Sequence, residues 1–264
     1  MRLQTVLALA AVLSVPTAAA DAAQERVAVK AKRIVTGAGE TIENGVILIE
    51  DGRIKALGAD LEAPWDAVVH EADTVYPGLV EAHNSRGLDT ANENVPVTPF
   101  ISVLDAVDPS SFFFEDSRRD GVTTMLVIQG NNTVVGGTGM IVRPTGLTVE
   151  DMTIRPVAGM KISVSPKSGF TRMTQMAELR KAFRTLAYEI EVAANEKEKE
   201  AMGKGEKEAE AVESADLDVK WRALNDLANG KMDAFVYCGS AMDVQNGIDI
   251  ASDNGFLART TFVL

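Results

Sequence analysis

The sequence has few of the residues from which disulfide-stabilised proteins and histidine-based metal sites are built. Its 264 residues include one Cys and two His. The single Cys238 allows no intramolecular disulfide, and two imidazoles are few for a metal centre that uses His ligands. Positive charge is also scarce, since 26 Lys and Arg face 38 Asp and Glu and leave a formal net charge of −12. That balance argues against nucleic acid as a partner, because its binding requires a cationic surface.

Long apolar runs are also absent, with one short exception at the start. Arg2 is followed by the mostly apolar run Leu3–Val15, and Pro16 and a series of small residues come next. The run is shorter than the ~20 residues that a membrane-spanning helix needs, and the pattern is typical of a cleaved signal peptide. We therefore expect residues 1–22 to be a signal peptide, the protein to be exported (periplasmic or secreted), and no later segment to span a membrane.

Two regions follow that differ in their periodicity. Residues 23–76 contain short apolar runs separated by Asn44-Gly45 and Asp51-Gly52, which predicts strands joined by tight turns. Residues 77–264 instead predict strands that alternate with helices. The expected strands after the first are 123–129, 158–164, 232–238 and 258–264. The expected helices carry the apolar stripes Met173–Ile190, Leu217–Leu227 and Val244–Ala251.

A charged segment interrupts the second region. Glu196–Asp218 contains nine acidic residues and four Lys, with almost no large apolar side chain. We interpret residues 194–218 as a charged helical insertion that is exposed to solvent. A partner-binding acidic arm is the alternative.

Three motifs carry a family resemblance. They are the stretch from Pro77-Gly78 to His83, the stretch Asp120–Thr124, and the strand-turn pattern Gly45–Ile54. With them the chain resembles the amidohydrolase superfamily, near its imidazolonepropionase-like members. The resemblance implies an α/β fold in which a small N-terminal β-sandwich portion precedes a partial TIM-like (β/α)8 barrel. Five expected barrel strands, where the closed barrel has eight, suggest an N-terminal fragment with open sheet edges.

The resemblance also assigns candidate metal ligands, and several are replaced. His83 matches the first ligand of the family, but Ser85 stands where the family has its second His. Lys161 is a candidate for the bridging carbamylated Lys of some members, or an ordinary Lys at a strand end. Tyr237 and Gly239 stand where later His ligands are expected. Cys238 is offset by one residue and would point to the other face of its strand.

A Gly-rich stretch after the second expected strand is the last candidate. Gly136, Gly137, Thr138 and Gly139 suggest a substrate-lining loop, since backbone N–H groups of such loops can hold anions and barrel enzymes bind substrate on this face.

The family activity is metal-assisted hydrolysis of C–N bonds in cyclic or other non-peptide amides, typically with zinc. The replaced ligands predict that this activity is impaired here and that no cofactor binds tightly. The alternative is a metal-free, non-catalytic relative that binds a ligand or a partner subunit. The expected partners are a small amide substrate or another subunit, and homo-oligomers are possible.

Overall fold

The computed structural model describes residues 26–204 and 209–264, which form two compact units, Met1–Pro77 and Gly78–Leu264. The predicted signal peptide at residues 1–22 lies outside the described residues. We describe each unit by itself.

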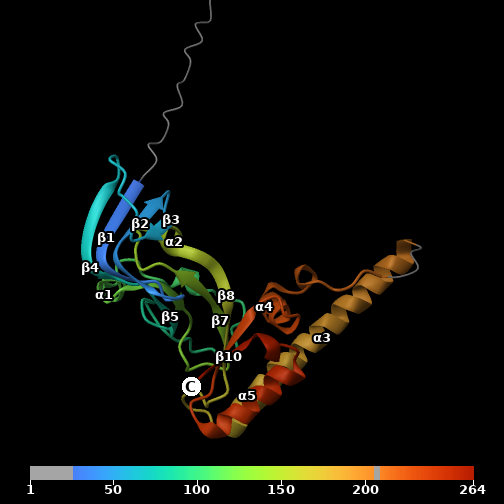
Figure 1. The fold of residues 1–264 in the computed structure, drawn as a ribbon. Helices are drawn as coiled ribbons and strands as arrows, with labels where there is room; N and C mark the ends of the chain where they lie inside the picture. The colour runs from blue at the N-terminus through green and yellow to red at the C-terminus, as the bar shows by residue number, and fades with distance from the viewer. Residues whose placement is uncertain (1–25, 205–208) are drawn as a thin grey trace, which may run out of the picture. The chain divides into compact units, whose positions relative to one another are not determined.

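The described part of the first unit is one four-stranded sheet, coloured blue to cyan in Figure 1. Its strands are β1 (Arg26–Val35), β2 (Thr41–Glu50), β3 (Arg53–Gly58) and β4 (Val68–Val75), in the order β3-β2-β1-β4. β1 pairs antiparallel with β2 and parallel with β4. Ala31, Ile34 and Ile47 form its small buried cluster. The described residues thus supply a single small sheet where a β-sandwich portion was expected.

One of the two predicted turns of this unit is correct. Asp51 and Gly52 have φ of 51° and 70° and connect β2 to β3, as a two-residue hairpin turn requires. Asn44-Gly45 was wrongly predicted as a turn, because both residues lie inside β2, where Gly45 pairs with Ala31. A Cβ on Gly45 would lie 2.8 Å from side-chain atoms of Ile34 and Ile42, so glycine here permits close packing.

The second unit is built on a six-stranded sheet in the order β10-β9-β8-β7-β6-β5. Its strands are β5 (Leu79–Asn84), β6 (Val122–Val127), β7 (Val135–Val142), β8 (Thr153–Ser163), β9 (Asp233–Tyr237) and β10 (Thr260–Val263). β5, β6, β8, β9 and β10 share one direction, and β7 runs antiparallel between β6 and β8. The predicted fold class is confirmed: a mixed α/β fold with a partial, barrel-like sheet.

β7 corrects the predicted Gly-rich substrate loop. Val135–Val142, including Gly136, Gly137, Thr138 and Gly139, is a strand paired with both neighbours. The glycines serve close packing, since a Cβ on Gly137 would lie 2.6 Å from the Ile101 main-chain oxygen. The amide hydrogens of Gly137 and Thr138 are donated to Gln129 Oε1 and to the Ile101 oxygen. These two N–H groups are therefore not free to hold an anion.

Five helices accompany this sheet in the described part of the chain. They are α1 (Phe112–Arg119), α2 (Val149–Met152), α3 (Arg172–Lys204), α4 (Val219–Ala228) and α5 (Ala241–Asp253). The apolar stripes predicted three of them, α3, α4 and α5, but not α1 and α2. Short 3-10 turns occupy η1 (Val103–Asp105), η2 (Ser214–Asp216) and η3 (Leu257–Arg259). Leu179 of α3 and Leu224 of α4 are fully buried in the main core, together with Val236 of β9.

The charged insertion continues α3 away from that core. In Figure 1 the second half of α3, coloured orange, extends well beyond the sheet of its unit. The returning chain is tied to it by Lys197, which pairs with Asp216 at 2.6 Å and donates to the main-chain oxygen of Ala211. The described part of the insertion is therefore the end of α3 and a returning segment, around residues 211–216, that contacts this helix.

Candidate functional site

The candidate site lies near the carboxyl ends of three parallel strands. His83 is near the end of β5, Lys161 near the end of β8, and Tyr237 ends β9. Lys161 pairs with Phe235 and Ser163 with Tyr237 across β8 and β9. Lys161, Phe235 and Tyr237 therefore point to one face of the sheet, because alternate residues of a strand share a face. Ligands of α/β folds bind at such strand ends.

Lys161 is the centre of this site. Its side chain is 0% exposed. Its Nζ donates to Asn131 Oδ1 at 2.6 Å and lies 2.8 Å from His83 Nε2. The amine also lies 5.6 Å from the centre of the Tyr237 ring. Burial lowers the pKa of Lys161 from 10.5 to about 7, because a charged amine is poorly solvated there and none of the described carboxylates forms an ion pair with it.

His83 is kept neutral by the same surroundings. Burial and the positive charge of Lys161 lower the pKa of His83 to about 4. A neutral imidazole has one ring nitrogen that can accept a hydrogen bond. A protonated Lys161 amine can only donate, so Nε2 is the acceptor of this contact when the amine is charged. The Phe235 ring packs beside His83 with its centroid 6.4 Å away. At neutral pH the pair is thus a neutral ring beside an amine that is only partly protonated.

The three glycines of the predicted loop contact different parts of the structure. Gly136 lies against the site, where a Cβ on it would be 3.0 Å from Lys161 Cβ and 2.5 Å from Gln129 Oε1. Gly137 and Gly139 instead abut Ile101 and Ile128. Asn131, a residue that the sequence did not single out for chemistry, supplies the second partner of Lys161. Its signal was only its position after an expected strand.

The residues present do not fit a divalent metal. Among residues 26–204 and 209–264, no three His, Cys, Asp or Glu side chains lie close enough together to hold one. Ser85 and Gly239 have no side-chain group that binds zinc strongly. The face of the Tyr237 ring is covered by the Lys161 amine. Cys238 packs in the core on the other face, and burial raises the pKa of its thiol to about 11. His83 Nε2, the one predicted imidazole ligand, already has the Lys161 amine as its partner.

A second polar cluster, which the sequence analysis missed, holds the loops beside the site. Asp243 is 1% exposed and accepts from Ser165 at 2.6 Å, Ser240 at 2.9 Å and Arg172 at 2.7 Å. Burial tends to raise the pKa of Asp243, and these hydrogen bonds with the Arg172 charge bring it below its usual value. Ser165 also accepts from the Gly239 amide. The cluster fixes the chain segments that follow β8 and β9.

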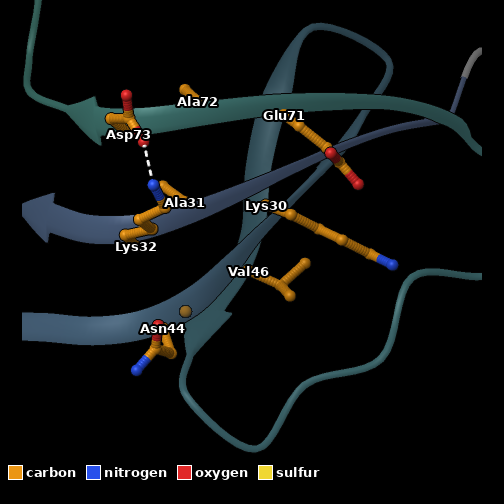
Figure 2. A pocket seen from close by; sticks show the side chains of 9 residues that line it. Lys30, Ala31, Lys32, Asn44, Val46, Glu71, Ala72 and Asp73 are labelled. Atoms are coloured by element: carbon orange, nitrogen blue, oxygen red, sulfur yellow. Dashed lines mark ion pairs between the residues drawn. The ribbon is translucent and has the colours of Figure 1, made fainter.

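The first unit has its own shallow cavity, of about 520 Å³, on its sheet. Figure 2 shows side chains of β1, β2 and β4 around it, including Lys30, Asn44 and Glu71. The dashed line joins Lys32 to Asp73, and both side chains of this ion pair are largely exposed. Exposed ion pairs are worth little energetically. We therefore assign no chemistry to this cavity.

The described helices also bear on the membrane prediction. Within residues 26–204 and 209–264, none has the length and apolar character required to cross a bilayer.

Comparison with known proteins shows which proteins this chain resembles. No family model matches the chain. Amidohydrolase tasK of Hapsidospora irregularis is 21% identical over 265 residues, and the match covers 83% of this chain but 25% of that protein. The crystal structure of an amidohydrolase from Thermotoga maritima MSB8 superposes with a TM-score of 0.75 at 23% identity, covering 89% of this chain and 63% of that one. The chain thus spans a quarter and just under two thirds of these two relatives. The shared fold and the distant sequence match relate the chain to the amidohydrolase superfamily, as its motifs predicted.

Proposed function

We propose that this chain is a metal-free relative of the amidohydrolases, which binds a small amide-type ligand and does not hydrolyse it. The observation that carries the proposal is the contact between Lys161 Nζ and His83 Nε2 at 2.8 Å. It engages Nε2, one of the two ring nitrogens through which a His can bind a metal. A zinc site needs three or four protein ligands, and the described residues bring no such set together.

The electrostatics of the site support binding without hydrolysis. A general base must be free to take a proton from water. His83 has a pKa of about 4 and already accepts a hydrogen bond, so it is a weak base at neutral pH. The fully buried Lys161 amine is held by two partners. A partner subunit, including a second copy of this chain, is the alternative occupant.

Metal-assisted hydrolysis of a C–N bond is the second candidate function, and one observation favours it. The pKa of Lys161 is lowered to about 7, so a large share of the amine is neutral at physiological pH. A neutral amine can add CO2 and release a proton to give a carbamate, which would convert Lys161 into an anionic ligand. This candidate requires the carbamate and further ligands beyond His83.

Zinc content separates the two candidates. The purified chain is incubated with zinc and bicarbonate and desalted, and its metal content and intact mass are measured. We expect far less than one zinc per chain and no mass gain corresponding to one CO2. About one tightly held zinc per chain, lost in Lys161→Met, would overturn the metal-free proposal. Ser85→His tests the missing ligand directly and should raise zinc retention little.

Turnover provides the matching functional measurement. Hydantoin, a cyclic amide, serves as the probe for calorimetric binding and for hydrolysis followed by chromatography. We expect saturable binding without product. Hydrolysis of hydantoin by the metal-depleted chain would contradict the proposal, and so would the absence of any binding.

A further inference from the structure

A second cavity, of about 260 Å³, is lined by the long connection that follows β5. Its walls are the segment 88–93, the segment 101–106 around η1, and Gln129 just after β6. Gln129 lies beside the candidate site, because a Cβ on Gly136 would be 2.5 Å from Gln129 Oε1 and 3.0 Å from Lys161 Cβ. The cavity therefore adjoins the candidate site, although neither Lys161 nor His83 lines it.

The walls of this cavity are held by main-chain hydrogen bonds. The Asp89 amide donates to the Ala106 oxygen at 2.9 Å, and the Gly130 amide donates to the Ala91 oxygen at 2.7 Å. Asn92 Oδ1 accepts from the Asn132 amide at 2.9 Å. Sites whose walls are formed before binding lose less entropy when a ligand arrives.

Gln129 leaves an unused donor in this wall. Its side chain is 4% exposed, and its Oε1 accepts from the Gly137 amide at 2.8 Å. That contact fixes the orientation of the amide group, since a reversed amide would set two donors against each other. Its Nε2 is buried and has no hydrogen-bond partner in the structure. An unsatisfied buried donor costs roughly 1–3 kcal/mol, so an acceptor that reaches it is favoured.

The charges at the cavity have one sign. Asp89, Glu93 and Asp105 line it, and no Lys or Arg does. None of the three carboxylates forms an ion pair with a described basic residue at salt-bridge distance. Lys167 Nζ donates to the main-chain oxygen of Glu93 at 3.4 Å and not to its carboxylate. The lining thus favours a cation over an anion.

We propose that this cavity binds a small organic cation that also carries a carbonyl oxygen, of the size of an amino-acid amide. The carbonyl oxygen accepts from Gln129 Nε2, and the ammonium group faces the three carboxylates. Because Nε2 is closed off from solvent, the side chains that cover it must shift on binding. The volume also exceeds that of one water molecule, ~30 Å³ in the liquid, so the cavity has room for such a compound. This inference goes beyond the proposed function and does not depend on the chemistry of Lys161.

Glycinamide is the probe, and calorimetry with the full chain is the measurement. Acetamide keeps the carbonyl without the charge, and methylammonium keeps the charge without the carbonyl. We expect saturable binding of glycinamide and about tenfold weaker binding of either half compound, as the loss of one hydrogen bond or one ionic contact implies. In side-chain amide NMR spectra, the Gln129 NH2 signals should shift on addition of glycinamide.

Two substitutions test the assigned roles. Gln129→Glu keeps the oxygen that accepts from Gly137 and replaces the unused donor by an acceptor, so it should weaken binding of the neutral acetamide about tenfold or more, a measurement in which the added charge attracts no ammonium group. Asp105→Asn removes one exposed charge and should weaken glycinamide binding about two- to fivefold. Asp253→Asn, an exposed change in α5, should leave binding unchanged.

Three results would overturn the proposal. They are the absence of saturable glycinamide binding, equal affinity for acetamide, and unchanged affinity both for acetamide in Gln129→Glu and for glycinamide in Asp105→Asn. Thermal unfolding of each variant shows whether it is folded. If Gln129→Glu fails to fold, the NMR shift of the wild-type Gln129 amide decides, and an unmoved signal counts against the site.

Discussion

Lys161→Met should remove a specific pH dependence from the stability of this protein. The amine is fully buried, and its pKa is about 7 in the folded chain, whereas its ordinary value is 10.5. Between these two values the unfolded chain holds a proton that the folded chain has released. Stability therefore rises with pH across this window and is lowest below the folded pKa, where the buried amine must be charged. Methionine has a similar length and does not titrate.

The magnitude follows from the two pKa values. Integrating the proton difference from about pH 7 to about pH 9, at 1.36 kcal/mol per pH unit, gives a gain of roughly 2 kcal/mol in the free energy of unfolding. Other groups with shifted pKa values act outside this window. His83 titrates below it, from an ordinary pKa of 6.5 to about 4 in the fold. Cys238, whose pKa is raised from 9.0 to about 11, begins to lower stability near pH 9, because the unfolded thiol ionises there first.

Urea unfolding at several pH values between these limits measures the effect. The wild type should gain about 2 kcal/mol across the window, and Lys161→Met should gain little. Lys181→Met, a change on the exposed side of α3, should keep the wild-type pH dependence. If Lys161→Met and the wild type give parallel profiles, the amine is charged in the folded protein, and our account of the site is refuted.

Two further predictions concern stability. Leu224→Ala, at a fully buried position of α4, should lower the free energy of unfolding by roughly 2–5 kcal/mol in urea titrations, whereas Leu257→Ala, at a 39% exposed position, should cost much less; equal losses would contradict the assigned core. Asp243→Ala should lower the free energy of unfolding by about 2 kcal/mol, because it leaves Arg172 and two hydroxyl groups without their acceptor. This value is smaller than for a fully buried ion pair, since Arg172 is partly exposed. Asp249→Ala is the exposed control. Because its folded pKa is lowered, Asp243 stabilises above its ordinary pKa, and this contribution should disappear as the pH falls through the folded value; an Asp243→Ala loss that stays constant down to low pH would refute this.

Local chemistry was sufficient to predict much of the fold. Asp51-Gly52 gave a hairpin because both residues tolerate positive φ. The apolar stripe from Met173 to Ile190 predicted a helix because it repeats with the helical period, and α3 covers it. The motif around His83 predicted the strand and, with it, the partial barrel.

Only the tertiary structure decided how the Gly-rich stretch and the polar groups are used. Gly136 to Gly139 read as a loop because glycine disfavours strands, yet neighbouring backbone and side chains approach so closely that only glycine fits in β7. Lys161 looked like a metal ligand or an ordinary strand-end residue. Its lowered pKa and its contacts with His83 and Asn131 arise from three segments far apart in sequence. Burial and long-range contacts of this kind depend on the packed fold, and no local sequence pattern encodes them.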